Sequence, residues 1–151
     1  MRELKKGTQL ADRYTLVRRL GGDGDAHLWL ARDRLTSAFV ALKITAGDPD
    51  STEKLRSEWH ISIRLMHAHI VRAFEFHAES DVAIFSQQFI DGPNIGVLSG
   101  LSSEEILGPV GLLLQAVAYL HAKGIVHRDI KASNLLLDLN GAPYLSDLAC
   151  R

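Results

Sequence analysis

A break at Gly92-Pro93-Asn94 divides the sequence into two parts with different hydrophobic patterns. Before the break, apolar residues recur at alternate positions in several short stretches, which is the pattern of half-buried strands. After it, a long apolar stretch lacks that alternation and is typical of a buried helix. Glycine and proline interrupt regular structure, so the break predicts a boundary between a strand-rich part and a helical part.

The first part is predicted to contain five strands and one helix. The strands are expected at 13–20, 26–31, 38–45, 70–76 and 82–89. The helix is expected at 51–66, with Asp50 and Glu53 as its capping pair. Its predicted apolar face consists of Leu55, Trp59, Ile63 and Met66.

Glu58 lies at the edge of that apolar face. Burying a carboxylate without a partner is costly, so a cationic side chain is expected to meet it. Four residues with three glycines, 21–24, join the first two strands. Such a hairpin could be a flap over a ligand or an ordinary turn, and the glycines alone do not distinguish these.

The second part is predicted to start with a helix from Ser102 or Ser103 to about His121, stopped by Gly124. Pro109 is expected to bend or locally interrupt this helix. Its apolar stretch is too interrupted for a membrane helix, which needs about 20 mostly apolar residues. A loop at 125–134 and two short strands at 135–138 and 144–146 are expected to follow.

Composition favours a soluble globular protein, with 46% hydrophobic residues, 23% charged residues and a net charge of −1. This balance provides no electrostatic signal for nucleic acid or an anionic membrane. The start of the chain lacks the apolar core of a signal peptide, and the only cysteine, Cys150, cannot form an internal disulfide. A cytoplasmic location is therefore expected, with no nucleic-acid partner and no membrane segment in this part of the chain.

Four residues near the end of the chain indicate chemistry. Asp129, Lys131 and Asn134 share one tight loop, and Asp147 follows at the end of the predicted hairpin. Phosphoryl transfer uses a carboxylate to orient a hydroxyl and accept its proton, a cation for the moving phosphoryl group, and oxygen ligands for magnesium. The loop therefore predicts a phosphoryl-transfer site.

The segment His127-Arg128-Asp129-Ile130-Lys131-Ala132-Ser133-Asn134 resembles the catalytic loop of protein kinases, and Lys131 is typical of the serine/threonine type. Val40-Ala41-Leu42-Lys43 is similar to the strand that carries the phosphate-binding lysine in that family, and Glu58 is similar to the helix glutamate that holds this lysine. The resemblance extends from about Tyr14 to Ala149.

This resemblance implies an α+β, protein-kinase-like two-lobe fold for 13–151. The amino-terminal lobe, 13–91, would hold an antiparallel five-stranded sheet with one helix, after an extension at 1–12. A hinge at 88–94 would lead into the first part of a helical lobe, 95–151. Because the chain stops at Arg151, a domain truncated after the metal motif is expected, and the fragment alone is expected to be inactive.

The resemblance also implies the site. Asp129 would be the catalytic base, Lys131 the cation at the transferred phosphoryl group, and Asn134 and Asp147 the ligands of Mg²⁺ or Mn²⁺. Gln87 would be the gatekeeper of the adenine pocket. The ATP-binding residues would be Leu20, Gly21, Gly22, Asp23, Gly24, Leu28, Ala41, Lys43, Glu58, Gln88, Ile90, Asn94 and Leu136. The substrates would be proteins with serine or threonine acceptors, the kinase itself among them.

Two motifs depart from the family pattern. Asp23 and Ala26 replace the second and third glycines of the flap, so that Asp23 and Asp25 would stand close to the ATP phosphates. At an effective dielectric constant of about 20, one such approach costs on the order of a few kcal/mol. Asp147-Leu148-Ala149 replaces D-F-G, which retains the metal ligand but removes the glycine.

These departures keep a pseudokinase open as the main alternative, that is, a nucleotide-binding or scaffolding module with little transfer activity. A small-molecule kinase of the aminoglycoside type shares the acid–asparagine–acid logic. Of the three functions, this small-molecule kinase is the one that the intact H-R-D-x-K-x-x-N segment favours least.

Overall fold

The computed structural model describes residues 1–92, 102–125 and 135–146, except the side chains of Asp23 and Ile106. Its elements fall into two compact units, which are described separately. The first comprises Met1–Ile63 and Ala73–Phe89, and the second comprises Arg64–Arg72 and the described residues from Ile90 onward.

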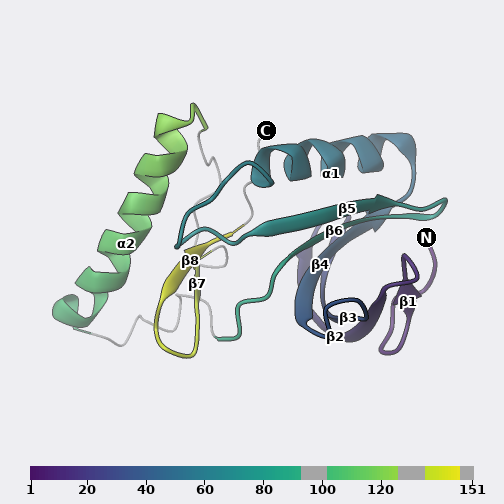
Figure 1. Cartoon of the computed structure of the whole chain (residues 1–151), viewed down its shortest axis with the longest axis horizontal. Coiled ribbons are helices and arrows are strands. Elements are labelled where there is room, and N and C mark those ends of the chain that lie inside the picture. Colours follow the sequence, from purple (N-terminus) through teal and green to yellow (C-terminus); the bar gives the residue numbers. More distant parts are fainter. Residues whose placement is uncertain (93–101, 126–134, 147–151) are drawn as a thin grey trace. The chain divides into compact units, whose positions relative to one another are not determined.

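The first unit contains a six-stranded antiparallel sheet in the order β1-β2-β3-β4-β6-β5 (Figure 1). The strands are β1 (Gln9–Leu10), β2 (Tyr14–Asp23), β3 (Ala26–Asp33), β4 (Phe39–Ala46), β5 (Ala73–Ala78) and β6 (Val82–Gln88). The five predicted strands are present, so the α+β prediction is confirmed. β5 starts later than predicted, because Ile70 instead bridges to Leu145 in the second unit.

The sixth strand, β1, comes from the segment that was predicted to be an extension. Gln9 pairs with Thr15 and Leu10 with Tyr14, across a tight turn in which Ala11 and Asp12 have positive φ angles of 55° and 49°. Leu10 is fully buried in the core of the first unit. A two-residue strand is too short to produce an alternating pattern, which is why the sequence did not reveal it.

The two faces of the sheet have different roles because successive side chains of a strand point to opposite sides. One face carries the larger core, which includes Leu16, Trp29, Leu42 and Ile84. The opposite face packs Ala83 and Phe85 against Leu55 of the helix α1 (Pro49–Ser62) and against Ala73. Lys43 pairs with Phe85 in the β4–β6 ladder and therefore shares the face that α1 covers.

The boundaries of α1 differ from the prediction at both ends. Asp48, not Asp50, is the N-cap, and its side chain accepts a hydrogen bond from the Ser51 backbone N–H at 2.9 Å. Pro49 follows at the first helical position, where a missing N–H costs nothing. The helix ends at Ser62, so the predicted face at Ile63 and Met66 is wrong, and both side chains are exposed.

The second unit contains the helix α2 (Ser103–Ala122) and a hairpin of β7 (Leu135–Leu137) and β8 (Pro143–Leu145). Ser102 caps α2 through a reciprocal pair with Glu105, and Gly124, with a φ of 75°, follows its end, as predicted. The helix continues through Pro109, so the local interruption expected there does not occur.

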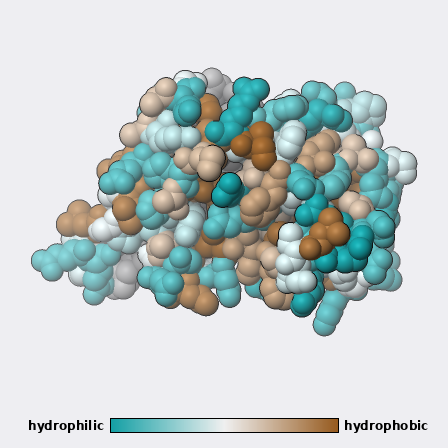
Figure 2. Space-filling model, viewed as in Figure 1, coloured by the Kyte–Doolittle hydropathy of each residue, from teal (hydrophilic) through white to brown (hydrophobic). Residues whose placement is uncertain are grey.

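One side of α2 is buried and the other is not. Leu113, Ala116 and Leu120 pack with Leu65, Ile70 and Leu145, whereas Leu107 and Leu114 are 67% and 62% exposed. By length and composition alone, α2 could also cross a membrane. Its packed side is that of a core helix. On the face drawn in Figure 2, hydrophobic side chains lie scattered among hydrophilic ones.

Candidate active site

Lys43 and Glu58 form a partly buried ion pair between β4 and α1. The Lys43 Nζ atom lies 2.7 Å from the Glu58 Oε1 atom, and the two side chains are only 16% and 13% exposed. The pair forms because Lys43 lies on the sheet face that α1 covers, where Leu55 and Phe85 hold the helix against the strands. The cation expected beside Glu58 is therefore Lys43, and the predicted pair is confirmed.

The β2–β3 hairpin forms the glycine-rich flap, with Asp23 paired to Ala26 and only Gly24-Asp25 between the strands. Gly24 has a φ of 61° and Gly22 a φ of 147°, both in the region that favours glycine. A Cβ atom at Gly22 would lie 2.5 Å from the Ala26 carbonyl oxygen. Gly22, expected only to lend flexibility, is thus sterically required. Leu20 and Gly21 lie on β2 within this hairpin, and Asp25 is exposed at its tip.

The residues predicted to sandwich the adenine lie partly on the face that carries Lys43. Leu28 is the cross-strand partner of Lys43, and Ala41 lies two residues before Lys43. Gln87 pairs with Ala41 and so faces the same way, while Gln88 ends β6. In the second unit, Ile90 is buried and Leu136 occupies the centre of β7.

Gly92 is a residue that sequence reasoning missed. A Cβ atom there would lie 1.9 Å from the Leu137 carbonyl oxygen, so the chain approaches the end of β7 more closely than any side chain allows. Gly92 was treated only as a breaker, and the close contact with β7 could not be read from its neighbours in the sequence.

The remaining predicted site residues, Asn94, Asp129, Lys131, Asn134 and Asp147, lie outside the described residues. The structure describes the hairpin between the last two of them. The Asp138 Oδ1 atom accepts hydrogen bonds from the Asn140 and Ala142 backbone N–H groups, both at 2.9 Å, which closes the turn.

This hairpin is also attached to the segment that follows α1. The Val71 N–H donates to the Leu145 carbonyl at 2.9 Å, and the Leu145 N–H donates to the His69 carbonyl at 2.8 Å. Within the described ranges, no group of three His, Cys, Asp or Glu side chains could hold a metal ion. In the sequence, the predicted ligand Asn134 directly precedes β7. The other predicted ligand, Asp147, comes two residues after the end of β8.

Comparison with known families decides the identity of this site. Residues 14–150 match the protein kinase domain. The chain belongs to the protein kinase domain family. Its Lys43–Glu58 pair, flap and β7–β8 hairpin are therefore parts of a kinase domain, as the sequence resemblance implied.

Several serine/threonine-protein kinases are similar to this kinase domain. PrkC of Bacillus subtilis is 30% identical over 149 residues, which cover 93% of this chain and 23% of PrkC. The DNA damage-responsive kinase RqkA of Deinococcus radiodurans is 34% identical over 156 residues, which cover 95% of this chain and 23% of RqkA. SIK2 of Gallus gallus is 36% identical over 141 residues, covering 89% and 18%. The chain thus spans about a fifth of the length of these relatives.

A second ion pair, with a buried carboxylate, supports the kinase domain away from the site. Arg13 donates to both carboxylate oxygens of Asp33 at 2.8 Å, and also binds Glu75. Asp33 is 2% exposed, and the hydrogen bonds from Arg13 lower the pKa of its carboxyl group to about 2. This pair joins the start of β2 to the end of β3. In the sequence, the only sign of this ion pair was an aspartate, Asp33, at the end of β3.

Proposed function

We propose that this kinase domain transfers the γ-phosphate of ATP to serine and threonine hydroxyls of proteins, with Mg²⁺ or Mn²⁺ as the metal. The observation that carries the proposal is the partly buried 2.7 Å contact between Lys43 and Glu58 on the sheet face beside the flap. An ion pair in this position presents a lysine to nucleotide phosphates. The serine/threonine specificity rests on Lys131 and on the names of the relatives.

The roles of the residues follow from the kinase resemblance. Asp129 would orient the acceptor hydroxyl and take its proton, and Lys131 would stabilise charge on the transferred phosphoryl group. Asn134 and Asp147 supply the amide and carboxylate oxygens that magnesium prefers. The metal, when bound, neutralises charge on the phosphates. The substrates would be proteins with serine or threonine acceptors, the kinase itself among them.

The test is Asp129→Asn in the protein that contains this chain. Phosphate transfer to a generic protein substrate should fall below detection, while the affinity for ATP and magnesium stays within about twofold, because this side chain contacts the acceptor rather than the nucleotide. Glu104→Gln, which neutralises an exposed carboxylate at the start of α2, should change neither. Unchanged transfer by Asp129→Asn would refute the assignment of the base.

The second candidate is a pseudokinase, which the flap favours because Asp23 and Ala26 replace two of its glycines. A titration of the unaltered protein with ATP and magnesium, followed by a transfer assay at saturating nucleotide, separates the two functions. Binding followed by transfer supports the kinase. Binding without transfer to any protein, including itself, supports the pseudokinase.

We also propose a cytoplasmic location for this domain. The single cysteine fits a reducing compartment. The net charge of −1 gives no signal for binding to an anionic membrane. Fractionation of cells that express the protein would test this, and recovery of residues 1–151 outside the cytoplasm would contradict it.

A further inference from the structure

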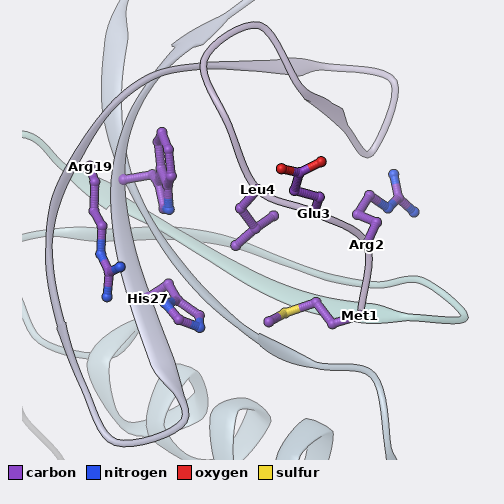
Figure 3. A pocket seen from close by; sticks show the side chains of 7 residues that line it. Met1, Arg2, Glu3, Leu4, Arg19 and His27 are labelled. Atoms are coloured by element: carbon purple, nitrogen blue, oxygen red, sulfur yellow. The ribbon is translucent and has the colours of Figure 1, made fainter.

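A pocket of about 250 Å³ lies on the side of the β2–β3 hairpin that faces away from Lys43. Its lining residues are Met1, Arg2, Glu3, Leu4, Arg19, His27 and Trp29 (Figure 3). Arg19 and Trp29 are cross-strand partners, and His27 is two residues from Trp29, so the three share one face of the hairpin. Leu28, the partner of Lys43, lies between His27 and Trp29 and points to the opposite face.

The N-terminal segment forms one wall of this pocket and is clamped in place by Arg2. The Arg2 guanidinium contacts the Asp81 carboxylate at 2.9 and 2.6 Å and the Glu79 carboxylate at 2.9 Å, and the Arg2 backbone N–H also donates to Asp81. These contacts attach Arg2 to the turn between β5 and β6, where Asp81 lies 79 positions further along the chain. Leu4 consequently packs on the core of the first unit.

The side chains of the N-terminal segment face in different directions. In Figure 3, Met1 and Leu4 point toward the side of the pocket where Arg19 and His27 lie, whereas the Glu3 carboxylate and the Arg2 guanidinium point away from it. The N-terminal wall is therefore apolar. The hairpin wall instead presents groups that can donate hydrogen bonds.

Two of these donors are short of partners. Arg19 donates through Nε to the Gly21 carbonyl at 3.2 Å, and across the described ranges no carboxylate pairs with it. Trp29 is 8% exposed, and its indole N–H has no hydrogen-bond partner among the same residues. The indole N–H has almost no exposed surface, so Arg19 and His27 are the donors of this wall that can reach a ligand in the pocket.

We propose that this pocket binds a small organic carboxylate. The carboxylate would lie against Arg19 and His27, because the planar guanidinium matches the two oxygens of a carboxylate. The hydrocarbon part would lie between Met1, Leu4 and the indole of Trp29. The pocket is smaller than the roughly 300–1,000 Å³ of sites for drug-sized ligands, so the ligand has only a few carbons.

The test follows the two tryptophan indole N–H signals by NMR in the whole chain during titration with butyrate. The Trp29→Phe variant assigns the two signals. Trp59 lies on α1 and packs on Phe76, so its signal reports whether each variant is folded. Butyrate should shift the Trp29 signal in a saturable way and leave the Trp59 signal in place. Butylamine, of the same size and opposite charge, should shift neither.

Two variants and a matched control complete the test. Arg19→Gln should weaken butyrate binding about tenfold, the usual effect of losing a hydrogen bond to a charged group. Arg2→Gln should weaken it as well by releasing the N-terminal wall. Lys5→Gln removes an exposed cation of the same segment that does not line the pocket and should bind as before.

An unmoved Trp29 signal would overturn the proposal, and so would equal binding of butylamine or unchanged affinity in Arg19→Gln. Binding of inorganic phosphate but not butyrate would also overturn it, because the apolar wall would then have no role. None of these measurements depends on ATP or on phosphate transfer, so the result is independent of the proposed kinase activity.

Discussion

Asp33 shows how one buried carboxylate stabilises the kinase domain. Its pKa in the folded state, about 2, lies below the usual value of 3.8 because Arg13 donates two hydrogen bonds to it. A carboxyl group with a lowered folded pKa stabilises the fold at pH values above its unfolded pKa. The stabilisation, about 2 kcal/mol for this shift, is lost as the pH falls from about 4 toward 2.

We therefore expect Asp33→Asn to lower the free energy of unfolding by about 2 kcal/mol at pH 7, as measured by denaturant titration. The difference from the unaltered protein should shrink between pH 4 and pH 2. Asp12→Asn is the control, since the Asp12 side chain is 99% exposed and its contact with Arg34 is long. Equal stability of Asp33→Asn and the unaltered protein at pH 7 would contradict this role.

Lys43 and Glu58 act as one unit in the proposed site. Lys43→Met and Glu58→Gln should each weaken ATP–magnesium binding by about tenfold, because the first removes the lysine and the second removes the charge-assisted contact that positions it. The double variant should be little weaker than either single one, because residues in one ion pair are not additive. Calorimetric titration measures all three. Lys54→Met, an exposed lysine on α1, should bind normally, and additive losses would show that the pair is not coupled.

At the level of elements, alanine substitutions at two glycines of the second unit should have opposite effects on stability. Gly92→Ala should destabilise this unit and lower hydrogen-exchange protection in β7, because its Cβ would lie 1.9 Å from the Leu137 carbonyl oxygen. Gly108→Ala has no heavy atom within 4 Å of its Cβ and lies inside α2. It should stabilise the helix by about 0.5–1 kcal/mol. A neutral Gly92→Ala variant would show that the chain does not approach β7 this closely.

Across the whole molecule, both units bury a core and leave some large apolar side chains exposed. The sheet of the first unit buries large side chains such as Tyr14, Phe85 and Leu42 almost completely. In the second unit, Leu107 and Leu114 are separated by two helical turns on the same face of α2, and both are largely exposed. Each such side chain forgoes roughly 1.5–3 kcal/mol of burial.

We expect residues 102–125 of the 151-residue chain to exchange their amide hydrogens faster than β3, β4 and β6, and the chain to bind a dye specific for apolar surface. Leu107→Glu with Leu114→Glu should reduce dye binding without lowering stability. Leu113→Glu, at a position only 8% exposed, should unfold the second unit. Strong protection of α2 with no dye binding would contradict this prediction.

Local patterns in the sequence were enough to predict most elements. The alternation in β2, β3, β4 and β6 and the serine and glycine that bound α2 depend on neighbouring residues alone. The motif around Lys43 and its spacing to Glu58 predicted an ion pair that the fold contains. Such features are readable because side-chain period and turn chemistry are properties of a few consecutive residues.

Other features depend on where distant segments meet. Ile63 and Met66, for example, lack the cover that a helical period implied. The clamp of Arg2 on Asp81 and the pocket beside Trp29 join the N-terminal segment to strands far along the chain. A hydrophobic period states which face of an element prefers burial, but the partner that covers that face is set by the path of the whole chain, and this is why these contacts became visible only in the folded structure.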